Sequence, residues 1–197
     1  MSATVLDRPT PSGDYREFRF DARNSCAWIL FQPPTEEDWV GVFGAGDYGG
    51  TIVVVDWNVE RAVVVATGRG YIVDTSSRTL VAQPLDENFQ DAVYDPSGQR
   101  VILADDLRVF VVDSSGALLW NTNRLSIAGI RHLKVVGPVV HGEAWTYGGS
   151  SDEDSWFPFT VDLDTREVSG GTHYEPVVNV GLLHRIKRRV AAVFRAR

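Results

Sequence analysis

An internal repeat is the strongest constraint that this sequence places on its fold. Residues 51–81, shifted by 39 positions, align without a gap to residues 90–120, and eight of the 31 pairs are identical. The identical pairs include Asp56 with Asp95, Arg61 with Arg100, and Asp74 with Asp113. A unit that recurs at about 40 residues predicts an array of similar supersecondary elements whose apolar faces cover one another.

The second copy shows what one unit contains. Short β-branched and aliphatic runs predict four strands, at 91–94, 101–104, 108–112 and 118–120. The segments 95–98 and 113–116 predict hairpin turns, because an aspartate caps such a turn and a glycine supplies a positive φ. Similar runs predict another four-stranded unit between 130 and 170, and a first, incomplete unit with strands at 15–20, 26–32 and 39–43.

Four units of about 40 residues, each a four-stranded meander, resemble a β-propeller. The copy that runs from Tyr94 to Asp113 looks like a WD40-type blade, although the Gly-His and Trp-Asp signatures of that family are absent. The segment 139–145 is also similar to small uncharacterised bacterial proteins with propeller-like repeats, a resemblance that implies no activity. We therefore expect an all-β, propeller-like array of about four four-stranded antiparallel units over residues 15–174. A duplication inside a β-sandwich is the alternative.

The two ends of the chain are expected to lie outside this array. Residues 1–14 are predicted to be flexible. Residues 175–197 are predicted to form a basic amphipathic helix, since residues 184–197 hold six basic and no acidic side chains, whereas residues 1–183 carry 13 basic and 26 acidic ones. The tail could dock on the acidic body, lie on an anionic membrane surface or nucleic acid, or stay disordered. A lone cysteine and the absence of an apolar leader favour a cytoplasmic protein.

The glycines of residues 44–49 have the spacing of a dinucleotide-binding motif. That motif requires a helix directly after its last glycine, so that the helix N-terminus faces a pyrophosphate. Here the β-branched run of residues 51–55 follows, which predicts a strand. We therefore interpret the glycines as a tight connection between two units and expect no cofactor.

Acidic side chains gather in the loops that the repeat assigns to one rim of the array. These loops join second to third strands or one unit to the next. Their candidate partner-binding residues are Glu36, Glu37, Asp38, Asp47, Tyr48, Asp86, Glu87, Asp105, Asp106, Tyr147, Asp152, Glu153 and Asp154. Only Arg69 and Arg124 oppose these acids, so the rim is expected to attract a basic partner. The alternative is that the loops are acidic for solubility alone.

Catalytic and metal motifs are weak in this sequence. His141, Glu143 and Trp145 alternate along one predicted strand and therefore share a face, either as an acid–base pair beside a sugar-stacking ring or as an exposed strand surface. The acidic segment 151–155 could hold calcium, but it lacks EF-hand spacing, and no metal site is assigned.

These observations favour a non-enzymatic protein-binding module with an acidic face. A bacterial immunity protein that neutralises a basic toxin fits this physical character. A carbohydrate-binding or glycoside-cleaving propeller is the alternative, because tryptophans and carboxylates are plentiful.

Overall fold

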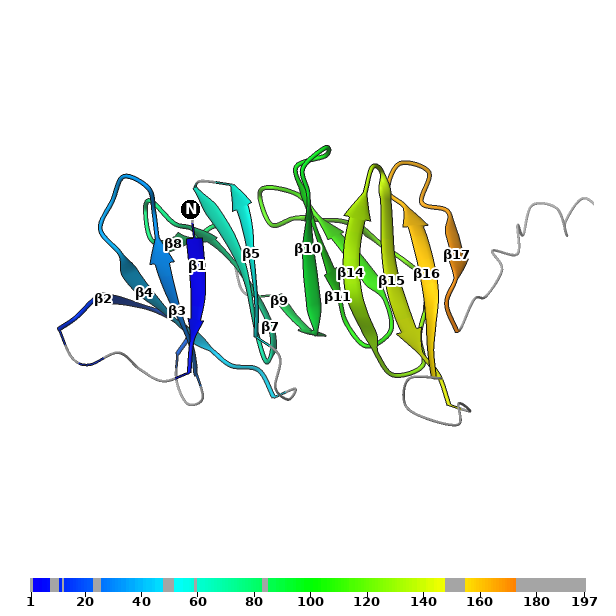
Figure 1. The fold of residues 1–197 in the computed structure, drawn as a ribbon, viewed down its shortest axis with the longest axis horizontal. Coiled ribbons are helices and arrows are strands. Elements are labelled where there is room, and N and C mark those ends of the chain that lie inside the picture. Colours follow the sequence, from blue (N-terminus) through cyan, green and yellow to red (C-terminus); the bar gives the residue numbers. More distant parts are fainter. Residues whose placement is uncertain are drawn as a thin grey trace, which may run out of the picture.

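A computed structural model describes the protein over residues 2–7, 11, 13–22, 26–47, 52–58, 60–82, 85–147 and 155–172. In residues 52–58, 86 and 87 it describes the backbone alone. The described residues form 17 strands in four sheets, which follow one another in a row from the N-terminal to the C-terminal end (Figure 1). The predicted fold class is confirmed: the described chain is all-β, mostly antiparallel, and propeller-like in its succession of sheets. The first and last sheets lie at opposite ends of this row (Figure 1).

The third and fourth sheets are simple meanders, as the repeat predicts. Sheet 3 has the order β10-β11-β12-β13 and sheet 4 the order β14-β15-β16-β17, with antiparallel pairing throughout. The strands of sheet 3 are β10 (Asp91–Asp95), β11 (Arg100–Ala104), β12 (Val109–Val112) and β13 (Leu118–Asn121). Those of sheet 4 are β14 (Ile130–Val136), β15 (Val139–Trp145), β16 (Trp156–Asp162) and β17 (Val168–Gly170).

The second sheet has a broken outer strand. Its strands are β5 (Ile52–Asn58), β6 (Arg61–Ala66), β7 (Gly68–Asp74), β8 (Thr79–Leu80) and β9 (Leu85–Phe89). Both β8 and β9 pair antiparallel with β7, β8 near its end and β9 near its start. The segment 83–88, predicted as a loop between units, therefore contributes most of its residues to a strand.

The first sheet is complete, which corrects the expectation of an incomplete unit after a flexible N-terminus at 1–14. Its strands are β1 (Ser2–Leu6), β2 (Arg16–Phe20), β3 (Cys26–Gln32) and β4 (Trp39–Gly44). Their order is β1-β3-β4-β2, so β1 adds a fourth strand beside β3. Strand β2 lies on the outer edge and pairs parallel with β4. The chain therefore passes from one edge strand, β1, to the other, β2, before it forms the two central strands β3 and β4.

Three apolar clusters hold the four sheets together, one between each consecutive pair. Phe31, Trp39 and Phe43 of sheet 1 pack on Val64 and Tyr71 of sheet 2. Alternate residues of the same strands supply the other clusters, as the period of two in a strand requires. The cluster between sheets 2 and 3 contains Val63, Val65, Leu103 and Phe110, and the one between sheets 3 and 4 contains Ile102, Val111, Ala144 and Phe159.

The two predicted aspartate turns are present, with one correction. The Asp95 and Asp113 carboxylates each accept hydrogen bonds from the backbone N–H two residues later, at 3.0 and 2.8 Å. Gly116 has the expected positive φ of 84°. In the earlier turn Gln99, not Gly98, takes the left-handed conformation, with φ 49°, so our assignment of that role to Gly98 was wrong.

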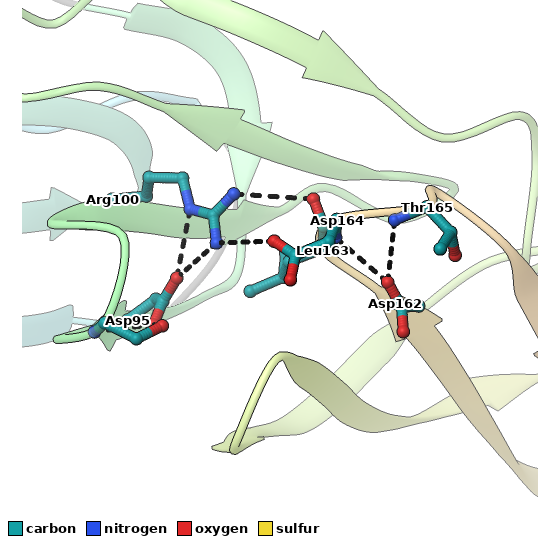
Figure 2. Close-up of polar contacts among 7 residues, drawn as sticks. Asp95, Arg100, Asp162, Leu163, Asp164 and Thr165 are labelled. Atoms are coloured by element: carbon teal, nitrogen blue, oxygen red, sulfur yellow. Dashed lines mark hydrogen bonds and ion pairs between the residues drawn. The ribbon is translucent and has the colours of Figure 1, made fainter.

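Arginines at matched repeat positions link consecutive sheets. Arg61 at the start of β6 donates a hydrogen bond to the Ser114 carbonyl in the last turn of sheet 3. Arg100 at the start of β11 donates to the Leu163 carbonyl, at 3.4 Å, in the last turn of sheet 4 (Figure 2). The repeat thus preserves a contact between neighbours in addition to strands and turns.

None of the described residues belongs to a helix long and apolar enough to cross a membrane. The predicted tail helix, at 175–197, lies outside the described residues.

Candidate binding surface

The ends of the strands form two opposite rims of the array. We call connection rim the end that holds residues 44–47, 66–68, 105–108 and 121–129. We call turn rim the end that holds residues 75–78, 96–99, 113–117 and 163–167. In sheets 2 to 4 the predicted sorting of loops between these rims is correct (Figure 1).

Backbone hydrogen bonds tie the connection rim together across sheet boundaries. Gly46 donates to the Ala66 carbonyl at 3.1 Å, and its own carbonyl accepts a hydrogen bond from the Thr67 hydroxyl at 3.0 Å. Leu125 donates to the Leu107 carbonyl at 2.7 Å, and Ile127 donates to the Trp145 carbonyl at 3.0 Å. Gln90 donates to the Ala104 carbonyl at 2.7 Å across the boundary between sheets 2 and 3, so the loops of this rim are held as one continuous surface.

Glycines 44 and 46 serve close packing at this rim. A Cβ on Gly44 would lie 2.2 Å from the Asp21 carbonyl oxygen, and one on Gly46 would lie 2.5 Å from the Thr67 carbonyl oxygen. No side chain fits at either distance. The dinucleotide-like glycine spacing thus reflects backbone contacts with neighbouring strands, while Gly49 lies outside the described residues.

Three predicted acids meet on the connection rim. Two hollows of about 320 and 330 Å³ adjoin there and share Asn88 as a wall. Asp105 and Asp106 line one hollow, and Asp47 lines the other. Residues far apart in sequence therefore form one polar surface, as the repeat register predicts for these three.

Basic and amide side chains on this rim that we did not assign to the site have acidic partners, and the arginines among them offset part of the negative charge. Arg69 pairs with Asp21 at the end of β2, and Gln90 donates to Asp106. Arg108 lies 3.3 Å from the buried Asp105 carboxylate, which also accepts the backbone N–H groups of Leu107 and Arg108. Because Arg108 sits on a strand in the repeat, loop composition alone gave no signal that it turns toward this rim.

Glu36, Glu37 and Asp38 do not join this surface, which corrects their assignment. Glu36 lies 3.5 Å from Arg78, a residue of the turn rim. The reason is geometric: the loops 33–38 and 44–47 flank the single strand β4, so they must emerge at its opposite ends. Six residues of extended strand separate those ends by about 20 Å.

The remaining predicted site residues divide between described and undescribed segments. The backbone of Asp86 and Glu87 lies on the connection rim, since Asp86 pairs with Arg69 in the ladder between β9 and β7. Tyr147 follows β15 and is 74% exposed. Tyr48, Asp152, Glu153 and Asp154 lie outside the described residues, as does most of the alternative calcium segment. Within the described ranges, no group of three or more His, Cys, Asp or Glu side chains could hold a metal ion.

The outward face of sheet 4 gathers the second set of candidate residues. His141, Glu143 and Trp145 share this face, as predicted, and cross-strand pairing adds Arg131 from β14 and Trp156 from β16. Arg131 Nε donates to Glu143 Oε2 at 2.8 Å, and its guanidinium lies 4.2 Å from the Trp156 ring centroid. Trp145 meets Tyr147 edge to face, with ring centroids 4.5 Å apart.

The contacts of Glu143 set its charge state. The hydrogen bond from Arg131 holds the pKa of Glu143 below its usual value despite partial burial, with a smaller contribution from His132. The carboxyl is therefore ionised at neutral pH, which suits a hydrogen-bond acceptor and not a general acid.

Comparison with known proteins adds little to this picture. No protein-family model matches the chain, and no curated protein matches it. Among solved structures, the chain is similar to one described as the crystal structure of the eukaryotic initiation factor, with 12% sequence identity and a TM-score of 0.44. That match covers 77% of this chain and 43% of the other, so the chain spans less than half the length of that protein.

Proposed function

We propose that this protein is a non-enzymatic, protein-binding module of the WD40-like propeller type whose connection rim receives a basic partner. The observation that carries the proposal is the meeting of Asp47, Asp105 and Asp106 around two adjoining hollows. Clustered acids on a continuous rim raise the local concentration of a basic partner and speed its association. The proposed role, consistent with this electrostatics, is that of a cytoplasmic bacterial immunity protein that masks a basic toxin.

Because residues 33–38 lie on the turn rim, they are not part of the proposed surface, and their acidic side chains can serve as its control. Asp47 is exposed, and Asp106 has Gln90 as a contact. On the turn rim, Glu37 is exposed and Glu36 has Arg78 as a contact. The two pairs match in charge, but they lie on opposite rims.

The test compares two double variants, Asp47→Lys with Asp106→Lys and Glu36→Lys with Glu37→Lys. Each changes the net charge of −7 by the same four units. The probe is a fluorescent deca-arginine peptide, with a deca-glutamate peptide as its control. We expect the connection-rim variant to bind the deca-arginine peptide about tenfold more slowly at low salt. The turn-rim variant should change this association rate little. Equal slowing by both variants would assign the effect to net charge and overturn the proposed surface.

The glycan-binding alternative rests on a separate observation, the aromatic and charged face of sheet 4. It requires no acidic rim and no basic partner. Its chemistry can be tested independently of the connection rim.

A further inference from the structure

The 39-residue repeat continues into sheet 4, but on one face of that sheet polar side chains replace the aliphatic ones. The second strands β6, β11 and β15 keep the 39-residue spacing, which matches Val63 with Ile102 and His141. The same spacing matches Val65 with Ala104 and Glu143. In sheets 2 and 3 these positions are at most 1% exposed, because they pack on the next sheet. His141 is exposed and Glu143 half-buried.

The arginine that contacts the next sheet is replaced in sheet 4. The position that matches Arg61 and Arg100 is Val139, whose side chain cannot donate a hydrogen bond. A terminal repeat with a polar outer face is the usual way in which a repeat array ends. The outward face of sheet 4 is therefore built to meet solvent or a polar ligand, and not a further aliphatic sheet.

The polar and aromatic groups that share this side of sheet 4 are called here the terminal face, which consists of Arg131, His141, Glu143, Trp145, Tyr147 and Trp156. Arg131 and Glu143 cancel each other's charge through their hydrogen bond. Among the described residues, neither Glu143 Oε1 nor the His141 ring makes a hydrogen bond, so both can bind a ligand. Trp145 and Tyr147 place aromatic surface beside these groups.

We propose that the terminal face binds a neutral oligosaccharide. A sugar ring presents C–H groups that pack on aromatic rings and hydroxyl groups that exchange hydrogen bonds with carboxylate, imidazole and phenol groups. The internal ion pair favours an uncharged ligand, because a polyanion would meet the Glu143 carboxylate and a polycation would meet Arg131.

The geometry suits binding and not cleavage of a glycoside. Glycosidases place two carboxyl groups within about 10 Å and raise the pKa of one of them. The hydrogen bond from Arg131 lowers the pKa of Glu143. Asp162 lies on the same face, but it is four residues along β16 from Pro158, the cross-strand neighbour of Glu143, which is about 13 Å.

The test uses tryptophan fluorescence, since two tryptophans lie on the terminal face. The full chain is titrated with cellohexaose, xylohexaose, mannohexaose, laminarihexaose and chitohexaose in about 0.5 M salt, which suppresses purely ionic association. Separate titrations use a heparin fragment and a deoxythymidine oligomer at low salt. Tyr147→Ala and Glu143→Gln remove a ring and a charge from the face, and Tyr15→Ala at the opposite end of the array is the matched control.

We expect saturable binding of a neutral hexasaccharide that survives high salt. Tyr147→Ala and Glu143→Gln should each weaken it at least tenfold, with Tyr15→Ala unchanged and all three variants folded by circular dichroism. No saturable response to any neutral sugar, binding of the polyanions alone, or unchanged affinity in both terminal-face variants would overturn the proposal. The connection-rim variants leave this face intact, so this result is independent of the deca-arginine experiment.

Discussion

Arg61 and Arg100, 39 residues apart, make the same contact with the sheet that follows their own. Each stands at the start of a second strand and donates to a backbone carbonyl in the last turn of the next sheet, at Ser114 and Leu163 respectively. Arg100 has an additional partner in its own sheet, because its Nη2 lies 2.7 Å from Asp95 Oδ2 (Figure 2). The two arginines therefore differ in how much stability each should provide.

Replacing Arg100 by methionine should destabilise the protein by about 3 kcal/mol, because the Asp95 carboxylate would remain in the interior without its cation. Arg61→Met should cost about 1 kcal/mol, since it removes a hydrogen bond to a carbonyl and, among the side chains that the structure describes, leaves no buried carboxylate without its cation. Urea unfolding measures both. Equal losses would mean that the shared link between sheets, and not the Asp95 pair, determines the effect.

The carboxyl groups of Asp95 and Asp91 should titrate in opposite directions from their ordinary values. Burial alone would raise the pKa of Asp95, but hydrogen bonds from Ser97 and Arg100 outweigh burial and lower it. Burial raises the pKa of Asp91 despite hydrogen bonds from Leu133 and Ala92. Carbon-13 NMR of the two carboxyls should show Asp91 taking up its proton first as the pH falls.

The stability effects of these two groups then have opposite signs. The contribution of Asp95 is present above the unfolded pKa of about 3.9 and is lost as the pH falls below it, through the lower folded value. For Asp91 the protonated carboxyl is the form that favours folding. Its contribution to stability therefore grows as the pH falls through the raised folded pKa toward the unfolded pKa of about 3.9. Asp95→Asn should flatten the acid limb of the stability curve. An acid limb unchanged in Asp95→Asn would contradict this assignment.

Gly46→Ala should cost about 2–3 kcal/mol, because the new Cβ would lie 2.5 Å from the Thr67 carbonyl and the connection would have to shift. Gly137→Ala is the comparison: its φ of 60° is strained, but no atom lies within 4 Å of the new Cβ. That variant should lose about 1 kcal/mol. Thermal unfolding distinguishes the two, and a smaller loss at Gly46 would contradict the close-packing role.

Making the terminal face resemble the matched faces of sheets 2 and 3 should cause self-association. The double variant His141→Ile with Glu143→Val restores the aliphatic chemistry of Val63 and Val65 at the end of the array. Light scattering coupled to gel filtration should show mass rising with concentration relative to the unchanged protein. An unchanged mass would mean that the polar residues are not what ends the array.

The repeat predicts sheets 2 and 3 well because it aligns their strands and turns, and similar strand-like runs predict sheet 4. It fails at the first sheet, which has no aligned copy, and there the pattern of three strands concealed the out-of-order β2 and the additional β1. Period-two burial is the same for parallel and antiparallel partners, so the burial pattern of 16–20 could not reveal its parallel pairing with β4.

The sequence predicts the rim on which a loop lies only when the direction of every strand before that loop is taken into account. Asp47, Asp105 and Asp106 meet because, with β8 and β9 counted as one broken strand, an even number of strands separates their loops. Glu36 was misplaced although β4 alone lies between it and Asp47, and a count of strand reversals would have placed it on the turn rim. The offsetting contacts of Arg69 and Arg108 depend on side-chain reach, which sequence spacing does not encode.

The unusual order of the first sheet has a consequence for how the chain folds. Sheets 3 and 4 pair neighbours in sequence and can form as soon as each hairpin is synthesised. In sheet 1, β1 must wait for β3, with Ser2 opposite Gln32, and β2 must wait for β4, with Arg16 opposite Trp39. Non-local pairing carries a larger loop-closure entropy and slows folding. The N-terminal sheet, although first to leave the ribosome, is thus expected to close last.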